Sequence, residues 1–241
     1  MSCLTKNQGF IRYLPGLLLM AFCVSQLHAQ TPGLNVKFDN LSIRDGLSQS
    51  SPNCILQDSK GFLWIGTEDG LNRYDGNAFE VFKPDGNDPY SISSTRINTL
   101  YEDQQGTLWI GTNGGGLNRY DRAGNGFVQP RSAGDSLLFE GQSVHALLMV
   151  DKETMLGGTE PGLRLFKPAV NQPVEDSVLT LLEHMSITAL VRVGNLIWIG
   201  TDQGLYRYDP RKRQLTASTG AESAAGSLPD ERITTLARGR I

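Results

Sequence analysis

The sequence predicts an all-β chain folded as a β-propeller built from four-stranded antiparallel blades. A Trp-Ile-Gly-Thr strand, a short turn and a Leu-x-Arg-Tyr-Asp strand occur together three times, with a fourth, degenerate copy at 155–166. The glycines shared by these copies lie at positions 66, 111, 158 and 200, which gives spacings of 45, 47 and 42 residues. Spacings in this range are typical of propeller repeats. Polar and apolar residues alternate within each copy as in half-buried strands, and no helical period is present.

Each repeat contains the signals for four strands. The two strands of the shared stretch are separated by an acidic or amide residue and a glycine, as in Glu68-Asp69-Gly70, which favours a hairpin turn because glycine adopts positive φ. Gly66, inside a strand, predicts close approach of a neighbouring backbone. A strand before the stretch would be innermost and one after it outermost. The innermost strand carries a small residue where blades crowd the axis, at Cys54, Thr99, Ala146, Ala189 and Thr235.

The N-terminal residues 1–29 have the features of a secretory signal peptide. Lys6 and Arg12 supply a positive start, residues 17–24 form an apolar run, and Ala29 is a small residue at the expected cleavage point. The apolar run is too short to span a bilayer comfortably, although an uncleaved anchor is the alternative. Residues 30–241 would then be the exported propeller domain.

The repeats divide the exported part into blades, and residues 35–42 are expected to form a lone outer strand before them. The third blade has lost its Trp, and we expect its outer strand at 177–182. The ring is predicted to be incomplete in this chain, with four blades plus one strand and exposed edges that favour aggregation. The approximate blade boundaries are 51–84, 96–130, 143–184 and 186–217, with the start of a fifth at 231–241.

Charge and cysteine content exclude some classes of protein. Without residues 1–29 the chain keeps 22 − 2 = 20 basic residues against 25 acidic ones, a net charge of −5. This balance argues against nucleic acid as a partner, because a phosphate backbone would be repelled. Cys54 is the single cysteine after residue 29, so no internal disulfide can form; it is expected to be buried and inert.

No catalytic, metal or cofactor site is predicted. His145 and His184 are dispersed, and with Cys54 they do not have the spacing of metal ligands. His145 opens an inner strand where other blades have Asn98, Thr188 and Thr234, so a polar side chain facing the channel is expected. Carboxylates such as Asp58 and Asp103 recur at one repeat position, which favours a role in turns over acid–base catalysis.

The candidate ligand-binding end is the one with the more variable loops. Because strands in a blade alternate in direction, the turns between second and third strands lie at the same end as the connections between blades. Function concentrates on variable loops held by a rigid scaffold, and the residue types here suit sugar hydroxyls and a stacking ring. Docking of a second propeller or partner chain at this end is the alternative. The candidate residues are Glu68, Asp69, Tyr90, Arg96, Asn113, Glu160, Asp202 and Gln203.

The pattern Trp-Ile-Gly-Thr-x-x-Gly-Leu-Asn-Arg-Tyr-Asp, preceded by Leu-Gln-Asp-Ser-Lys-Gly-Phe-Leu at 56–63, resembles the two-component regulator propeller repeat. The resemblance implies the extracytoplasmic sensor region of a membrane protein of the hybrid histidine kinase type, acting in a phosphorelay. It also implies a periplasmic domain tethered to the inner membrane, further propeller and sensor modules, a dimeric full-length form, and a small-molecule or oligosaccharide ligand such as a glycan fragment. A kinase or diguanylate cyclase module would lie downstream, and this chain itself would not be an enzyme.

Two other functions stay open at this stage. One is a scaffold propeller that binds protein. The other is a sialidase-like carbohydrate-active propeller, because Asp58-x-x-Gly61-x-x-Trp64 resembles the Asp-box of that family with one residue too many. The arginine triad and the Tyr–Glu pair of sialidases cannot be assigned in this sequence.

Overall fold

The computed structural model describes residues 40–218 and 232–237, and those of them from Leu41 onward form one compact unit. The expected signal peptide, and most of the expected strand at 35–42, lie outside the described residues. The described part opens with a short 3₁₀ turn, η1 (Ile43–Asp45). The Ser42 hydroxyl accepts a hydrogen bond from the Arg44 amide and so caps this turn.

Four separate four-stranded antiparallel sheets follow, each with its strands in chain order, which confirms the predicted β-propeller architecture. The first sheet contains β1 (Pro52–Gln57), β2 (Leu63–Thr67), β3 (Gly70–Tyr74) and β4 (Phe79–Phe82). The second contains β5 (Ile97–Glu102), β6 (Leu108–Thr112), β7 (Leu117–Asp121) and β8 (Gly126–Val128). The third contains β9 (Ser143–Met149), β10 (Met155–Glu160), β11 (Leu163–Lys167) and β12 (Gln172–Val174). The fourth contains β13 (Ile187–Val193), β14 (Leu196–Thr201), β15 (Gly204–Asp209) and β16 (Gln214–Ala217).

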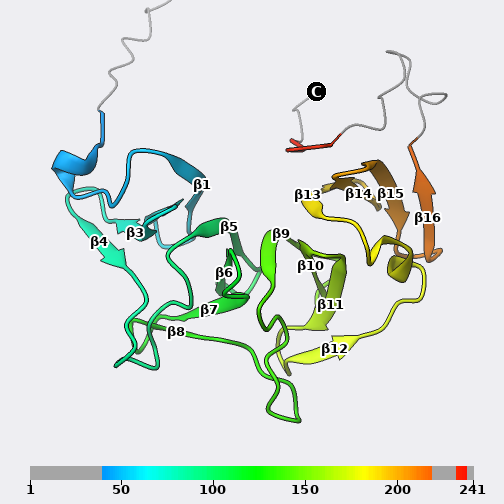
Figure 1. Cartoon of the computed structure of the whole chain (residues 1–241), viewed down its shortest axis with the longest axis horizontal. Helices are drawn as coiled ribbons and strands as arrows, with labels where there is room; N and C mark the ends of the chain where they lie inside the picture. Colours follow the sequence, from blue (N-terminus) through cyan, green and yellow to red (C-terminus); the bar gives the residue numbers. More distant parts are fainter. Residues whose placement is uncertain (1–39, 219–231, 238–241) are drawn as a thin grey trace, which may run out of the picture. The chain divides into compact units, whose positions relative to one another are not determined.

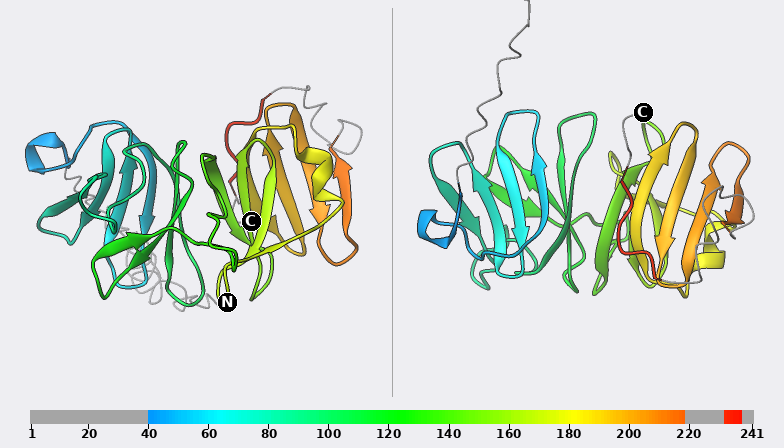
Figure 2. Two further views of the ribbon diagram at one scale, coloured as in Figure 1. Left: turned by 60° about the horizontal axis from the view of Figure 1, so that its bottom comes forward. Right: turned by 90° about the horizontal axis from the view of Figure 1, so that it is seen from above.

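The first strand of each sheet lies innermost and the fourth strand outermost (Figure 1). The strands of the four sheets run in roughly one common direction, so their turns gather at two ends (Figure 2). Neighbouring sheets pack face to face, with buried apolar side chains filling the space between them.

The expected outer strand of the third blade at 177–182 is wrong. The outer strand is β12, where Val174 pairs with Leu165 of β11, and residues Leu179–Leu182 form a 3₁₀ turn, η2. A 3₁₀ turn repeats every three residues, so Leu179 and Leu182 fall on one side of it. Both side chains are buried in the apolar cluster between the third and fourth sheets, where the lost Trp leaves Leu156 instead.

The shared glycines mark where neighbouring blades come closest. A Cβ added to Gly66 would lie 2.5 Å from Cys54 Sγ and 2.6 Å from Ile97 Cγ2, closer than real atoms approach. A close approach at Gly66 is therefore present, but the prediction that backbone makes it is wrong: the neighbours are the side chains of Cys54 in the same blade and Ile97 in the next. Gly111, Gly158 and Gly200 face the equivalent residues Val144, Ile187 and Ile233. Through Ile233, residues 232–237 dock on the fourth blade where the next inner strand is expected.

The recurring aspartates organise the turn between the first and second strands, as predicted. The Asp58 carboxylate accepts hydrogen bonds from the Lys60 amide at 2.9 Å, the Phe62 amide at 3.0 Å and Trp64 Nε1 at 2.9 Å. Asp103 makes the same three bonds with the Gln105 amide, the Thr107 amide and Trp109 Nε1. Each aspartate therefore also fixes the indole that fills the core between two blades, a role that the turn signal alone did not indicate.

Candidate functional site

The turns between second and third strands meet the connections between blades, as expected. The Gly70 amide donates to the Thr95 carbonyl at 2.7 Å, and Gly116 and Gly162 bond to Gln142 and Met185 in the same way. Because the donor is always a turn glycine and the acceptor always precedes the next inner strand, this end is built identically at three successive blades.

Every inner strand carries a β-bulge directly before its small residue. In the first sheet the pairing passes from Pro52 opposite Thr67 to Cys54 opposite Gly66, which leaves Asn53 as the extra residue. The same interruption occurs in the other three sheets. Bulges bend a strand and re-aim the side chain at the extra position. The bulged residues are Asn53, Asn98, His145 and Thr188.

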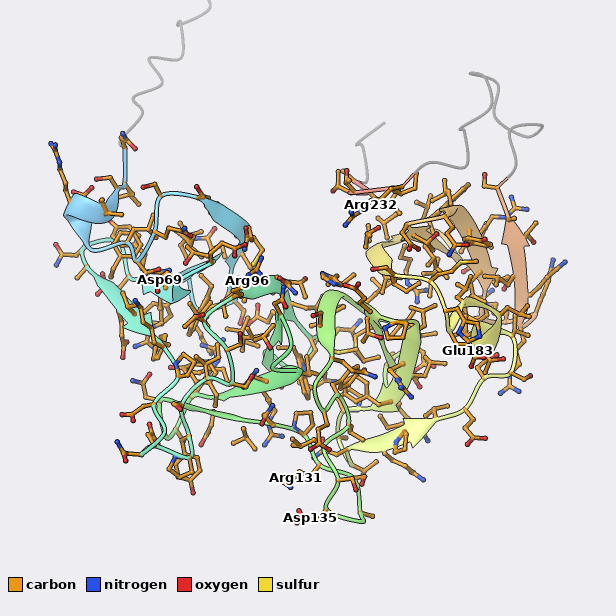
Figure 3. The ribbon with its side chains drawn as sticks, viewed as in Figure 1. Asp69, Arg96, Arg131, Asp135, Glu183 and Arg232 are labelled. Carbon is orange, nitrogen blue, oxygen red and sulfur yellow. The ribbon has the colours of Figure 1, made fainter. Side chains whose placement is uncertain are left out.

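The bulged side chains line one polar cavity, here called the axial polar hollow. Its volume is about 270 Å³. His145 was predicted to face a channel, and it lines this hollow together with its equivalents Asn98, Thr188 and Thr234. Arg96 and Arg232 both lie on the inner side of the sheets (Figure 3). The residues lining the axial polar hollow are Asn53, Glu68, Asn98, His145, Ser186, Thr188, Arg232 and Thr234.

Glu68 is the fixed negative charge of this hollow. Its carboxylate is 2.5 Å from Arg96 Nε and accepts a hydrogen bond from Asn53 Nδ2 at 3.1 Å. The hydrogen bond from Arg96, followed by that from Asn53, lowers the pKa of Glu68 below its usual value. Asn53 Nδ2 also donates to the Ile97 carbonyl, so it ties Glu68 to the next blade.

Two donors of the axial polar hollow are buried without a hydrogen-bond partner among the described residues. These are Asn98 Nδ2 and His145 Nε2. The nearest acidic oxygen to His145 Nε2 is Glu160 Oε2, at 3.6 Å, which exceeds hydrogen-bond distance. A buried polar group left unpaired costs about 1–3 kcal/mol, so a water molecule or ligand is expected to satisfy these donors.

The structure brings only part of the predicted site set to the axial polar hollow. Glu68 lines it, and Arg96 and Glu160 contact residues that line it.

The other predicted residues form hydrogen bonds or ion pairs within the chain. The Asp202 carboxylate accepts a hydrogen bond from the Ser186 backbone amide at 3.0 Å, and the Gln203 backbone amide donates to Thr201 Oγ1. Asn113 accepts a hydrogen bond from Ser143 Oγ at 3.2 Å. Asp69 instead pairs with Lys83 at 2.8 Å.

Tyr90 does not line the axial polar hollow. Its carbonyl accepts a hydrogen bond from the Phe127 amide at 2.7 Å, which places it beside the outer strand β8. Its side chain is 62% exposed and borders a separate cavity of about 390 Å³ that Arg131 also lines. Arg131 lies on the outer side of the sheets, away from Arg96 and Arg232 (Figure 3). The expected stacking ring is thus absent from the described lining of the axial polar hollow.

Among the residues that line the hollow, sequence reasoning listed only Glu68 as a ligand-binding candidate; it gave His145 no ligand role and missed Asn53 and Ser186. The available signal was the polar residue that precedes the small residue in every inner strand, which is Asn, Asn, His, Thr and Thr along the chain. No cluster of three or more metal-ligating side chains occurs within residues 40–218 and 232–237. In those same ranges no helix is long and apolar enough to cross a membrane.

Comparison with known sequences finds a matching repeat family and a similar curated protein. The family model described as "Two component regulator propeller" matches residues 46–69 and 91–114. Histidine kinase P4 of Formosa agariphila is 43% identical over 77 residues, which cover 32% of this chain and 6% of the kinase. The chain therefore spans a small fraction of that curated relative.

Comparison with solved structures gives neighbours of low sequence identity. The extracellular domain of the putative hybrid two component system BT3049 from B. thetaiotaomicron is 22% identical, with a TM-score of 0.47 over 74% of this chain and 31% of that domain. An ancestral GH74 enzyme is 10% identical, with a TM-score of 0.52 over 71% of this chain and 24% of the enzyme. At 10% identity, the match to the GH74 enzyme bears on the fold alone.

The four sheets and their inner-to-outer strand order define the chain as a β-propeller protein. Residues 46–69 and 91–114 match the two-component regulator propeller repeat, in agreement with the sequence resemblance.

Proposed function

We propose that this chain is the extracytoplasmic sensing propeller of a larger membrane-tethered signalling protein of the hybrid histidine kinase type. The repeats and the 43% identity to a histidine kinase over 77 residues support this proposal. The catalytic module would belong to a different part of that protein, and the propeller itself would bind rather than catalyse. Further propeller and sensor modules and a dimeric full-length form are part of the same proposal.

The proposed ligand site is the axial polar hollow, and the proposed ligand is a hydroxyl-bearing fragment of a glycan. The observation that carries this choice is the pair of unpartnered donors, Asn98 Nδ2 and His145 Nε2, at two bulged positions. Sugar hydroxyls accept hydrogen bonds from such donors and can donate to the Glu68 carboxylate. The volume of about 270 Å³ is below the ~300 Å³ of sites for drug-sized ligands, so one sugar unit would enter.

The sialidase-like alternative receives little support from the residues that suggested it. The Asp58 side chain is fully buried, and its two oxygens bond to backbone amides, Trp64 and Arg122. A carboxylate with all these partners is a structural group and is not accessible to a substrate.

The experiment is a titration of the purified chain with neutral oligosaccharides by calorimetry, using Asn98→Ala and His145→Ala as site variants. His184→Ala is the matched control, because His184 is highly exposed and does not line the hollow. Loss of one hydrogen bond of about 1 kcal/mol weakens binding roughly fivefold. Each site variant should show at least this loss while keeping its circular dichroism spectrum, and the control should bind as the parent does.

Unchanged affinity in both folded site variants would refute the choice of this hollow. If no sugar binds and a pulled-down protein partner is displaced by the same variants, the scaffold function would be favoured instead.

A further inference from the structure

Arg73 on β3 lies at the interface of the first and second sheets, and both terminal nitrogens of its guanidinium have polar partners. It donates to the Tyr120 hydroxyl at 2.5 Å and forms an ion pair with the Glu80 carboxylate. It also lies 5.0 Å from the ring centroid of Phe62 and 5.7 Å from that of Trp64. Glu80 is directly opposite Arg73 in the pairing of β3 with β4. This interface is filled by side chains of the chain itself.

At the next interface Arg119 takes the place of Arg73, since both arginines pair with the buried Trp of the preceding strand. Val128 stands opposite Arg119, where Glu80 stands opposite Arg73. Phe166 packs edge-on against Trp109 as Tyr120 does against Trp64, but it has no hydroxyl. Arg119 has consequently lost both partners of Arg73. Within the described part of the chain its guanidinium makes no hydrogen bond or ion pair.

A cavity of about 570 Å³ opens beside Arg119, here called the inter-blade hollow. This volume lies within the range of small-molecule sites. Met149, Pro168 and Val170 supply apolar surface, and the buried Trp109 also lines the cavity. It is distinct from the axial polar hollow, with which it shares no lining residue.

The charges around the inter-blade hollow are unequal. Arg119, Lys152 and Lys167 are cationic, and Asp103 and Glu153 are anionic. Asp103 already accepts three hydrogen bonds of 2.9–3.0 Å, and Glu153 lies 3.9 Å from Lys167. The cationic groups outnumber the anionic ones, and Arg119 has no anionic partner among the residues that the structure describes. The hollow therefore favours an anionic ligand.

We propose that the inter-blade hollow binds a small organic carboxylate with a ring-sized apolar body. The carboxylate would pair with Arg119 as that of Glu80 pairs with Arg73, and the body would rest on Met149 and Val170. Guanidinium and carboxylate match in a planar, two-bond geometry, which a point charge does not offer. The proposal does not depend on the function assigned to the axial polar hollow.

The test uses benzoate and cyclohexanecarboxylate as probes, with benzamide as the uncharged counterpart of benzoate, in calorimetric titrations of the purified chain. Val128→Glu is the main variant, because it restores an internal acid opposite Arg119. Val81→Glu is its matched control on the neighbouring outer strand, where Val81 faces Asn72 in the pairing and lies outside the hollow. Arg119→Gln removes the guanidinium itself.

Both carboxylates should bind at least tenfold more tightly than benzamide. Val128→Glu and Arg119→Gln should each lower carboxylate affinity at least tenfold, whereas Val81→Glu should leave it within twofold. Equal affinity for benzoate and benzamide, absence of binding by both carboxylates, or parental binding by folded Val128→Glu would each overturn the proposal. Val128→Glu keeps the test decisive if Arg119→Gln does not fold.

Discussion

Replacing Asp58 by Asn should destabilise the protein more than the same replacement at Asp103. The two aspartates hold equivalent turns and equivalent indoles with the same three hydrogen bonds. Asp58 has one additional partner, Arg122 of the second blade, whose Nη2 lies 3.0 Å from Oδ2. The two variants therefore differ chiefly by one ion pair between blades, in which Asp58 is buried and Arg122 is partly exposed.

The size of each effect follows from these contacts. In either variant the Asn carbonyl oxygen can keep the two backbone bonds, but its amide faces the Trp Nε1–H, so two donors oppose each other. A buried donor left unpaired costs about 1–3 kcal/mol, which is the loss expected for Asp103→Asn. Asp58→Asn also removes one carboxylate from Arg122, which is 30% exposed and keeps Glu102 Oε1 at 3.3 Å. Its total loss should therefore exceed that of Asp103→Asn but stay below the upper end of the about 3–5 kcal/mol for breaking a fully buried pair.

The pH dependence of stability gives the sign of the Asp58 contribution. Burial of this carboxyl favours a higher pKa, but the hydrogen bonds from Trp64, Arg122 and two backbone amides outweigh it and lower the pKa below the ordinary 3.8. A group whose pKa is lower in the folded state stabilises fully above its unfolded pKa and loses that contribution as pH falls through the folded value. The difference in the free energy of unfolding between the parent and Asp58→Asn should thus be constant near neutral pH and shrink below a pH of about 4.

Urea unfolding followed by tryptophan fluorescence and far-ultraviolet circular dichroism measures both effects. The two variants and the parent would be compared at neutral pH and at several acidic values. Equal losses for Asp58→Asn and Asp103→Asn would refute the inter-blade role of Arg122. If the loss of unfolding free energy in Asp58→Asn is as large in acid as at neutral pH, the assigned lowering of the Asp58 pKa would be refuted.

Three further predictions concern packing, reactivity and processing. Gly66→Ala should lower the free energy of unfolding by about 1–3 kcal/mol through overpacking, whereas Gly86→Ala, with no atom within 4 Å of its Cβ, should change it by at most about 0.5 kcal/mol; equal effects in urea unfolding would contradict this. Burial raises the pKa of the Cys54 thiol to about 12, so peptide mass spectrometry should find Cys54 unalkylated by iodoacetamide at pH 8 in the folded protein; labelling at the rate of the unfolded chain would contradict it. In an exporting host, N-terminal sequencing should show cleavage after Ala29 and a mature chain starting at Gln30; an intact Met1 in the membrane fraction would exclude cleavage.

The sequence by itself determined the blades because their signals are local. Strand alternation, turn glycines such as Gly70 and the turn-forming Asp58 all act within a few residues, and the repeat multiplies them. In the third blade these local signals do not identify the outer strand. Its true outer strand, Gln172–Val174, is three residues long and contains a proline, while Val178 to Leu182 is apolar and resembles a strand. Only the packing of Leu179 and Leu182 against Leu156 decided that this segment forms a 3₁₀ turn.

The sequence also identified the end of the propeller that holds the axial polar hollow, with Glu68 and Arg96 on it, because strand direction fixes which loops share an end. Tertiary structure decided which side chains converge there. The bulge at His145 is a relation between two paired strands, and the displacement of Tyr90 follows from the path of a long connection along β8. The inter-blade hollow depends on Val128 and Phe166, which lie on different blades and meet at Arg119 only after folding. A cavity is the space that distant residues fail to fill, so only their final positions define it.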